Sequence, residues 1–586
     1  MSAIQSAFPG SVLESRVESD RRLWITVDPK KLVEIAQFLR DKKDFDHYSG
    51  AAGIDRINDN LFEVVEILTS HGAHQVVVMM KVKVPRDRPS VRSLTGLYWN
   101  ANWYEREIWE MYGINFEGHP ELYPLLLPDE LVGYWPWRKD FKGYPDTTTG
   151  ERAIEQVGPD GYTEFKIMPH PELIKAGVVP ERPKYPTFRE REEAEIKSDS
   201  EMIMHMGPQH AIVPGPFLLD LLIEGERVKK AFLDVGYIHK GIEKIMENRT
   251  YLQGLVYTDR MCYLASITNN EAYCGAVEKL LGITPPERAQ YIRVILAELS
   301  RIQSHLLGTG EFLTLLGAAT YSPFQYMIID REDIVYLMES VTGARITHTF
   351  VRFGGVRNDL PDGFADKARP ILKRMRKRTE EYMDLLHSDP IYTRRMRGIG
   401  VLSPGDARRL GVSGPPLRAS DTPYDMRRED PILVYPDLDF KVVTRKAGDA
   451  EARVEVRLEE ILESIHIIEQ CLDQIPDGPI QEKLPKKIKP EPGEAYYRVE
   501  DPRGEMGFYV VSDGSEKPYR VKVRGPVYAY MQALPPLLEG AYVADVVAIA
   551  AGAHSSFALK SDGSLWATGS NNFGQLGVGG NLNKNT

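Results

Sequence analysis

VEVRLEEILESIHIIEQCLDQI, residues 454–475, decides the fold of the larger part of this chain. Its apolar residues recur three or four positions apart, the spacing of one helical face, at Val454, Leu458, Ile461, Ile465, Ile468, Leu472 and Ile475. The same spacing occurs earlier in the chain at Ile292, Ile295, Leu299, Ile302 and Leu306. Helices with such faces must bury them against one another, so the sequence predicts a helical bundle.

Local signals predict where elements of this bundle start and turn. Thr284-Pro285-Pro286-Glu287 has the T-x-x-E spacing of a capping box, which predicts a helix start before the stripe at 292–306. Phe508–Val511 and Tyr519–Val523 read as strands, and the turn residues 512–515 between them predict a β-hairpin.

The first 145 residues follow a mixed pattern of strands and helices. Leu23–Val27 reads as a strand, and Asp28 and Pro29 then have the pattern of an N-cap and a helix-opening proline. Two runs rich in β-branched residues, Leu61–Leu68 and Gln75–Val84, predict a second hairpin. The fold class expected for the chain is therefore α+β.

A chain of 586 residues is too long for a single core, and its composition changes along its length. We expect four segments: an α+β domain at 1–145, a proline-rich and charged linker at 146–198, a large mainly helical domain with small β elements at 199–547, and a short tail at 548–586.

Composition narrows the functional classes. The net charge of −11 argues against a nucleic-acid surface, and the 42% of hydrophobic residues allows sizeable cores. The three cysteines, Cys262, Cys274 and Cys471, include no C-x-x-C pair, which argues against a disulfide framework and fits a reducing compartment. The apolar run 541–553 contains Asp545 and is too short to span a bilayer, and the first residues lack a signal-peptide pattern. Membrane association is therefore expected through partners.

Residues 103–120, WYEREIWEMYGINFEGHP, are the densest motif of the first segment. They predict a short helix that ends at Gly113, with charges on one face and aromatic rings on the other. Aromatic residues are enriched at interfaces, so a docking surface is favoured over catalysis.

This motif, with Arg138-Lys139-Asp140, resembles the C subunit of complex I, the energy-converting quinone oxidoreductase. Motifs that resemble its D subunit follow in order: Gly207–His210, Gly236–Lys244, Arg249–Gln253, Asp259–Met261, Ala276–Gly282, Arg352–Val356, Leu417–Ser420 and Ser512–Gly514. Over about residues 1–547 the chain therefore resembles fused C and D subunits.

The resemblance implies a peripheral subunit, on the cytoplasmic face of the cell membrane, of an NADH:quinone oxidoreductase coupled to proton translocation. The family's D subunit walls a quinone cavity beside an iron–sulfur cluster held by a small B-like subunit. Further implied partners are the H-like and A-like membrane-arm subunits and other peripheral-arm subunits. A cluster takes four thiolates and this chain has three cysteines, so it is expected to bind no cofactor alone, with quinone as substrate. No G-x-G-x-x-G or P-loop suggests nucleotide binding either.

Four site residues are carried over from the resemblance. Tyr263 matches the tyrosine of the quinone head-group site, where a phenol can donate a proton, and His210 is expected beside it. Arg260 matches an arginine near the partner's cluster, and His348 is expected near that cluster. Without the resemblance, a core tyrosine would be an equally good interpretation of Tyr263, and a surface ion pair would be the better interpretation of Arg260.

Three departures put the quinone site in question. The family's G-P-Q-H-P-x-x-H-G carries a second quinone ligand, but here Pro214 stands at that histidine and cannot donate a hydrogen bond. The run 311–317 lacks the aspartate that pairs with it, and Thr347 replaces a further histidine unless the alignment shifts by one to His348. Two alternatives thus stay open: a non-catalytic scaffold that docks the cluster-bearing subunit to the membrane arm, and a reductase of a non-standard acceptor.

Two other stretches resemble known families without giving a functional assignment. The run from His210 to Pro216 is similar to the large subunits of nickel–iron hydrogenases, but those need four cysteine ligands and only Cys262 is at such a position. Cys262 is then expected to be an inert thiol. Residues 551–577 resemble one repeat of the RCC1 propeller family, which needs several blades to close. A binding appendage and a mis-joined reading frame are both open, and we assign this tail no function.

Overall fold

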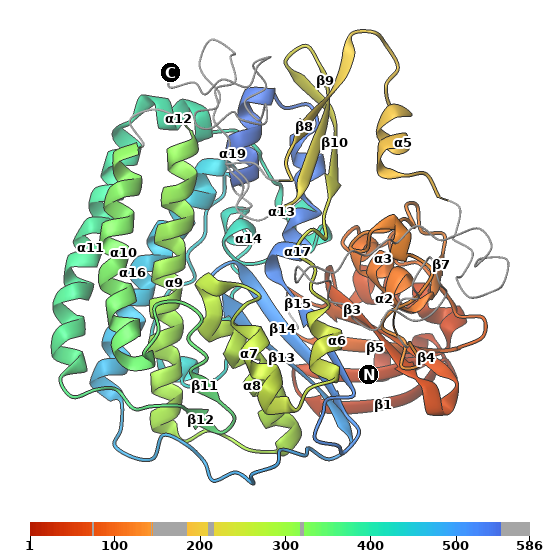
Figure 1. The fold of residues 1–586 in the computed structure, drawn as a ribbon, viewed down its shortest axis with the longest axis horizontal. Coiled ribbons are helices and arrows are strands. Elements are labelled where there is room, and N and C mark those ends of the chain that lie inside the picture. Colours follow the sequence, from red (N-terminus) through yellow and green to blue (C-terminus); the bar gives the residue numbers. More distant parts are fainter. Residues whose placement is uncertain (73–74, 142, 144–184, 209–215, 317–320, 552–586) are drawn as a thin grey trace, which may run out of the picture.

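The computed structural model describes residues 1–72, 75–141, 143, 185–208, 216–316 and 321–551. Within them the chain has an α+β architecture, with a β-rich N-terminal part beside a large helical part that carries small sheets (Figure 1). The predictions for His210, Pro214 and the tail after residue 551 lie outside the described residues, as does most of the predicted linker.

The N-terminal part is built on one five-stranded sheet. Its strands lie in the order β1 (Val12–Ser19), β2 (Arg22–Val27), β5 (Val77–Pro85), β4 (Leu61–Thr69) and β3 (His47–Arg56). The pair β2–β5 is parallel and the other pairs are antiparallel. The predicted strand at 23–27 and the predicted hairpin of β4 and β5 are thus confirmed.

Both faces of this sheet are buried. Alternate residues of a strand point to opposite faces, and Leu23 and Ile25 pack under the helices α2 (Leu32–Lys43) and α3 (Ala101–Tyr112). Trp24, on the other face, packs against Tyr509 of a second sheet. The five-stranded sheet therefore lies between the helices α2 and α3 and the second sheet.

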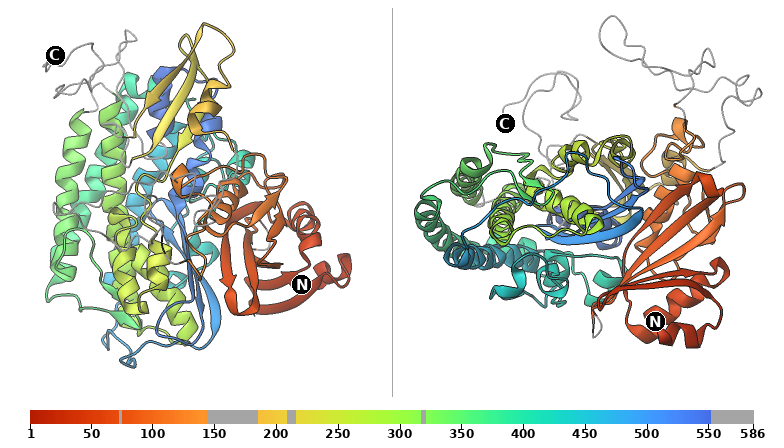
Figure 2. Two further views of the ribbon diagram at one scale, coloured as in Figure 1. Left: turned by 45° about the vertical axis from the view of Figure 1, so that its right-hand side comes forward. Right: turned by 90° about the horizontal axis from the view of Figure 1, so that it is seen from below.

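The second sheet belongs to the helical part. It consists of β13 (Gly493–Asp501), β14 (Gly504–Ser512) and β15 (Arg520–Arg524), all antiparallel. The predicted hairpin is confirmed, with Tyr509 opposite Lys522. Figure 2 shows this sheet lying against the N-terminal sheet, and the two share one apolar cluster. Segments more than 400 residues apart in sequence thus form a common core.

The helical bundle has α9 (Glu287–Leu315) at its centre. Around it pack α8 (Ser266–Leu281), α10 (Tyr321–Thr342) and α16 (Ala450–Gln474), and α11 (Phe364–Ser388) packs against α10 and α16 (Figure 1). Both predicted apolar stripes are confirmed, because they lie on α9 and α16 in the same buried cluster. None of the helices in the described part of the chain combines the length and apolar character needed to cross a membrane.

One local prediction is wrong. The capping box at Thr284 does not form, because α9 begins after Pro286, whose side chain makes no capping hydrogen bond. The predicted helix that ends at Gly113 is confirmed as α3, and its carboxylates Glu105, Glu107 and Glu110 are all buried. Glu110 accepts hydrogen bonds from three consecutive backbone N–H groups, the first at 2.9 Å from Leu125. Helix α3 is an internal docking element of this chain.

A third sheet lies at the end of the molecule where α9 ends (Figure 1). It contains β8 (Glu201–Met206), β9 (Leu218–Glu224) and β10 (Arg227–Asp234) in the order β10-β9-β8.

The described end of the predicted linker forms α5 (Phe188–Glu193), which starts with a capping box between Thr187 and Glu190. The remaining elements are α1 (Ser2–Ala7), β6 (Ser90–Arg92), β7 (Asn115–Glu117), α6 (Ile242–Glu247), α7 (Tyr251–Thr258), β11 (Val351–Arg352), β12 (Gly355–Val356), α12 (Pro390–Met396), α13 (Pro404–Arg409), α14 (Pro415–Ala419), α15 (Met426–Glu429), α17 (Pro526–Met531), α18 (Leu534–Leu538) and α19 (Val546–Ala551).

Candidate functional site

The connection between α7 and α8 carries two of the predicted site residues on an open surface. Helix α7 starts with a capping box between Thr250 and Gln253, and the chain then passes through Arg260 to a short 3-10 turn that begins at Tyr263. The Tyr263 side chain is 56% exposed, and that of Arg260 is 52% exposed. Both groups therefore face outward, where a partner or substrate can reach them.

A buried carboxylate fixes this connection. Asp259 is fully buried and accepts hydrogen bonds from the side chains of Asn270 and Thr349, and burial raises its pKa. Asn270 also accepts the backbone N–H of Phe350 at 3.2 Å. The loop at 347–350 is thereby tied to α8, and its two threonines adopt positive φ angles that such residues rarely take. Such strain persists only where surrounding contacts hold the loop in place.

Arg260 is positioned by its own helix. Its Nη1 donates to the carbonyl of Val256 at 3.0 Å and lies 3.8 Å from Asp259 Oδ2. One guanidinium edge is thus occupied, while about half of the side chain remains open to solvent.

His348 lies beneath the same loop instead of on its open face. The side chain is buried, and Nδ1 is 2.6 Å from the hydroxyl of Ser266 at the start of α8. Burial lowers the pKa of His348 to about 4, so the ring is neutral at pH 7. Among the described residues, Nε2 has no hydrogen-bond partner.

Two arginines that the sequence did not single out border the same site. Arg503, in the turn between β13 and β14, lies 3.3 Å from Cys262 Sγ and donates to Ser304 at 3.0 Å. Arg331 on α10 is largely buried and interacts electrostatically with Tyr263. Only the fold could identify them, because each is far from Tyr263 in sequence.

Cys262 has the environment of a protonated thiol. Burial raises its pKa, although the guanidinium of Arg503 acts in the opposite direction. The other two cysteines are buried and unpaired, and burial also raises the pKa of each.

A small, partly open cavity lies elsewhere in the bundle. Its volume is about 20 Å³, and its walls include Thr268, Glu271, Met426, Tyr435 and Glu500. This space suits about one water molecule and is too small for an aromatic head group. Tyr263 is not among the walls of this cavity. A closed head-group site at the exposed Tyr263 therefore needs walls from elsewhere.

A buried ionic network stiffens the bundle behind the site. Burial by itself raises the pKa of Glu298 on α9, but Arg301 and Arg427 outweigh it and lower the pKa to about 2. Glu460 on α16 lies 2.8 Å from His305 Nε2 and accepts a hydrogen bond from Arg418 Nε at 2.8 Å. The hydrogen bond between His305 and Glu460, and the one that Ser464 donates to Glu298 at 2.6 Å, join α9 to α16. Arginines of α14 and α15 compensate the two buried carboxylates, and removing these partners would leave a charge in a nonpolar interior.

Comparison with protein families gives matches along most of the chain. Residues 25–147 match the 30 kDa subunit of respiratory-chain NADH dehydrogenase, and residues 316–492 and 482–558 match the 49 kDa subunit. Residues 240–314 match the nickel-dependent hydrogenases. A weak match to the RCC1 repeat covers residues 546–575.

Individual relatives match nearly over their whole length. The D subunit of the F(420)H(2) dehydrogenase of Methanosarcina mazei is 58% identical over 361 residues, which are 61% of this chain and 96% of that protein. The D subunit of the NADH-quinone oxidoreductase of Geobacillus thermodenitrificans is 45% identical over 350 residues, 60% of this chain and 95% of the relative. A chain of the membrane-bound sulfane sulfur reductase, an archaeal respiratory membrane complex, has a TM-score of 0.58 and 38% identity, over 60% of this chain and 96% of its own length.

Proposed function

This chain belongs to the family of the NADH-quinone oxidoreductase D subunit, with a 30 kDa-subunit region in the same polypeptide, and from this premise we propose that it passes electrons from a partner's iron–sulfur cluster to a quinone. The observation that carries the proposal is the exposure of Arg260 and Tyr263 together on one turn. The cluster is assigned to a partner, because a cluster takes four thiolates and this chain has three cysteines.

Tyr263 is the proposed proton donor. Reduction of a quinone to a quinol takes two electrons from the cluster and two protons, and the Tyr263 hydroxyl supplies one proton to a carbonyl oxygen. Solvent then returns this proton to Tyr263 and supplies the second proton of the quinol. His210 is the proposed second side chain at the head group.

Arg260 is the proposed electrostatic neighbour of the partner's cluster. A fixed cation stabilises the reduced cluster and so raises its reduction potential. The buried Asp259 and the Val256 carbonyl hold this cation in one place. His348 lies behind it and positions the loop at 347–350 through Ser266.

The proposed setting is a membrane-bound respiratory complex. The structural relative comes from such a complex, and we assign this chain to the cytoplasmic face, bound to a B-like iron–sulfur subunit and to H-like and A-like membrane subunits, with coupling to proton translocation. The other peripheral subunits of the complex determine which molecule donates the electrons. NADH and F420H2 are both candidates, since relatives are named for each.

The second candidate function is a docking scaffold without quinone chemistry. Pro214 favours it, because proline stands where the family has its second quinone ligand and carries no exchangeable proton. A reductase of a different acceptor is the third reading of the same substitution.

The test is quinone reduction by the assembled complex with Tyr263→Phe in this chain. We expect about a 100-fold lower rate, the usual contribution of a general acid, with assembly unchanged. Tyr336→Phe is the matched control, since Tyr336 on α10 is also about half exposed. Equal rates for both variants would exclude the tyrosine's role, and a wild-type complex that assembles without inhibitor-sensitive quinone reduction would support the scaffold.

A further inference from the structure

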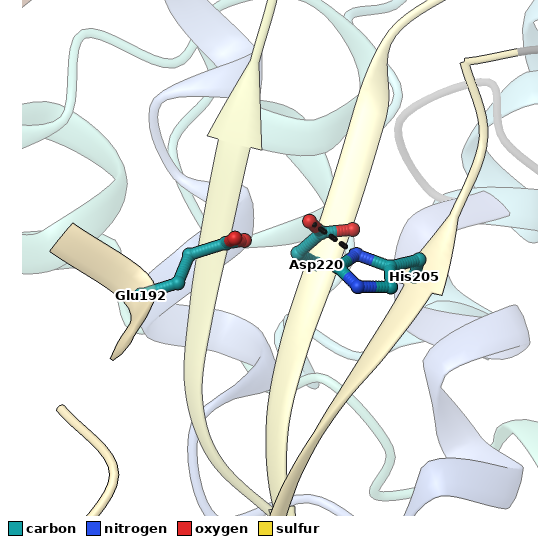
Figure 3. A group of neighbouring side chains, drawn as sticks. All are labelled: Glu192, His205 and Asp220. Carbon is teal, nitrogen blue, oxygen red and sulfur yellow. Dashed lines mark hydrogen bonds and ion pairs between the residues drawn. The ribbon is translucent and has the colours of Figure 1, made fainter. Parts of the chain in front are cut away.

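Three side chains that commonly bind metals converge at the β8–β9 end of the molecule, on residues that the electron-transfer proposal does not use. Glu192 comes from α5, His205 from β8 and Asp220 from β9 (Figure 3). His205 and Asp220 are direct cross-strand neighbours, with Nδ1 2.7 Å from Oδ2. One ligand atom from each of the three residues lies within 4.8 Å of the others.

The two carboxylates are buried without enough partners. Glu192 is 3% exposed and Asp220 is 1% exposed. Among the described residues, Glu192 Oε1 and Asp220 Oδ1 have no hydrogen-bond partner. Figure 3 shows the Glu192 carboxylate pointing toward Asp220 and His205. A buried carboxylate oxygen without a donor is costly, so this arrangement calls for a cation or a shared proton.

The surrounding charges do not satisfy these oxygens. Arg189 and Arg191 act on Glu192 only through space, and the Arg191 guanidinium lies over the ring of Tyr123 at 4.7 Å. Burial and the proximity of Asp220 together raise the pKa of Glu192. The pair is thus short of positive charge at its centre.

We propose that Glu192, His205 and Asp220 bind one divalent transition-metal ion of the zinc type. Two carboxylates neutralise its charge, and one imidazole nitrogen favours such an ion over Mg²⁺ or Ca²⁺, which prefer oxygen ligands. His205 is exposed, so the ion has an entry path and room for a water as its fourth ligand.

The geometry needs a small adjustment. A tetrahedral zinc site places its ligand atoms roughly 3.3 Å apart. The ligand atoms of Glu192, His205 and Asp220 lie within 4.8 Å of one another, so the longest of these distances must shorten by roughly 1.5 Å. Rotation of the Glu192 side chain can supply this movement, because Glu192 lies near the end of a six-residue helix. The bound ion then joins α5 to β8 and β9, and stabilises the end of the segment that links the two parts of the chain.

Zinc titration of the chelator-treated full-length chain tests this site. We expect one Zn²⁺ per chain that raises the unfolding temperature, because a ligand of the folded state alone stabilises it. Mg²⁺ at the same concentration should have no effect. His205→Ala should weaken this binding at least tenfold and remove the thermal shift, and Glu192→Gln should do the same.

His387→Ala is the matched control. His387 is an exposed histidine paired with a single carboxylate, Glu455, at 2.9 Å. Its replacement by alanine should leave zinc binding unchanged. Equal zinc affinity in His205→Ala and the wild type would overturn the proposal. A second outcome would also overturn it: zinc has no effect on the wild type, while Glu192→Gln without zinc is more stable than the wild type. That result would assign a shared proton to Glu192 and Asp220.

Discussion

Glu107 of α3 and Lys522 of β15 form a buried ion pair, with Oε2 and Nζ 2.5 Å apart, although 415 residues separate them in sequence. Glu243 of α6 lies 3.3 Å from the same Nζ. Burial by itself lowers the pKa of Lys522, but these two carboxylates outweigh it and raise the pKa. The pair joins the N-terminal part to the helical part at their shared core.

Lys522→Met should destabilise the chain by about 3–5 kcal/mol, because it leaves the buried Glu107 carboxylate without its cation, whereas Glu243 keeps Arg520 at 2.8 Å. The shift of the urea unfolding curve of the full chain measures this. Lys487→Met is the control, since its pair with Glu516 is open to solvent and should contribute little to the stability. Adding Glu107→Gln should recover part of the loss. Equal effects of the two lysine variants would contradict the role of the buried pair.

Arg260→Gln should lower the reduction potential of the partner's cluster in the assembled complex. One charge at roughly 10 Å, with an effective dielectric constant near 20, shifts a potential by tens of millivolts. A redox titration of the cluster, followed by its paramagnetic signal, measures the shift. Arg394→Gln, at an exposed position on α12, should leave the potential unchanged. An unchanged potential in Arg260→Gln would place the cluster elsewhere.

Protonation of His305 and His348 should remove stability as the pH decreases from about 6.5 toward 4. Burial lowers the pKa of both side chains to about 4, so each histidine binds more protons in the unfolded chain than in the folded chain in this range. Each histidine can contribute up to about 3 kcal/mol to this loss. Unfolding midpoints between pH 7 and 4.5 should change less steeply in His348→Asn. The exposed His387→Asn should keep the wild-type slope, and an equal slope in all three chains would refute the assignment.

Gly275→Ala should destabilise the chain, although alanine is the better helix former. Gly275 lies within α8, and a Cβ there would clash with the ring of Tyr497. Overpacking typically costs about 1–3 kcal/mol, which exceeds the gain of about 1 kcal/mol in helix propensity. Thermal unfolding of the single variants and of Gly275→Ala/Tyr497→Ala completes a mutant cycle. If Gly275→Ala destabilises the Tyr497→Ala chain as much as it destabilises the wild type, the clash with the Tyr497 ring is not the cause.

The sequence by itself determined the elements whose signals are local. The stripe from Val454 to Ile475 predicted α16, and the alternation around 508–523 predicted the hairpin of β14 and β15. Family motifs also placed Arg260 and Tyr263 near each other, because the two lie within one turn of the chain. Such patterns depend on neighbours a few residues away, which the sequence shows directly.

Tertiary structure alone decided which distant groups meet. Glu107 of α3 is buried because β15 supplies Lys522, and the T-x-x-E pattern at Thr284 forms no cap because α9 starts later, after Pro286. The arginines near Tyr263 and the group around Asp220 are assembled from separate elements. Contacts between residues far apart in sequence have no local period, so packing of the folded chain determines them.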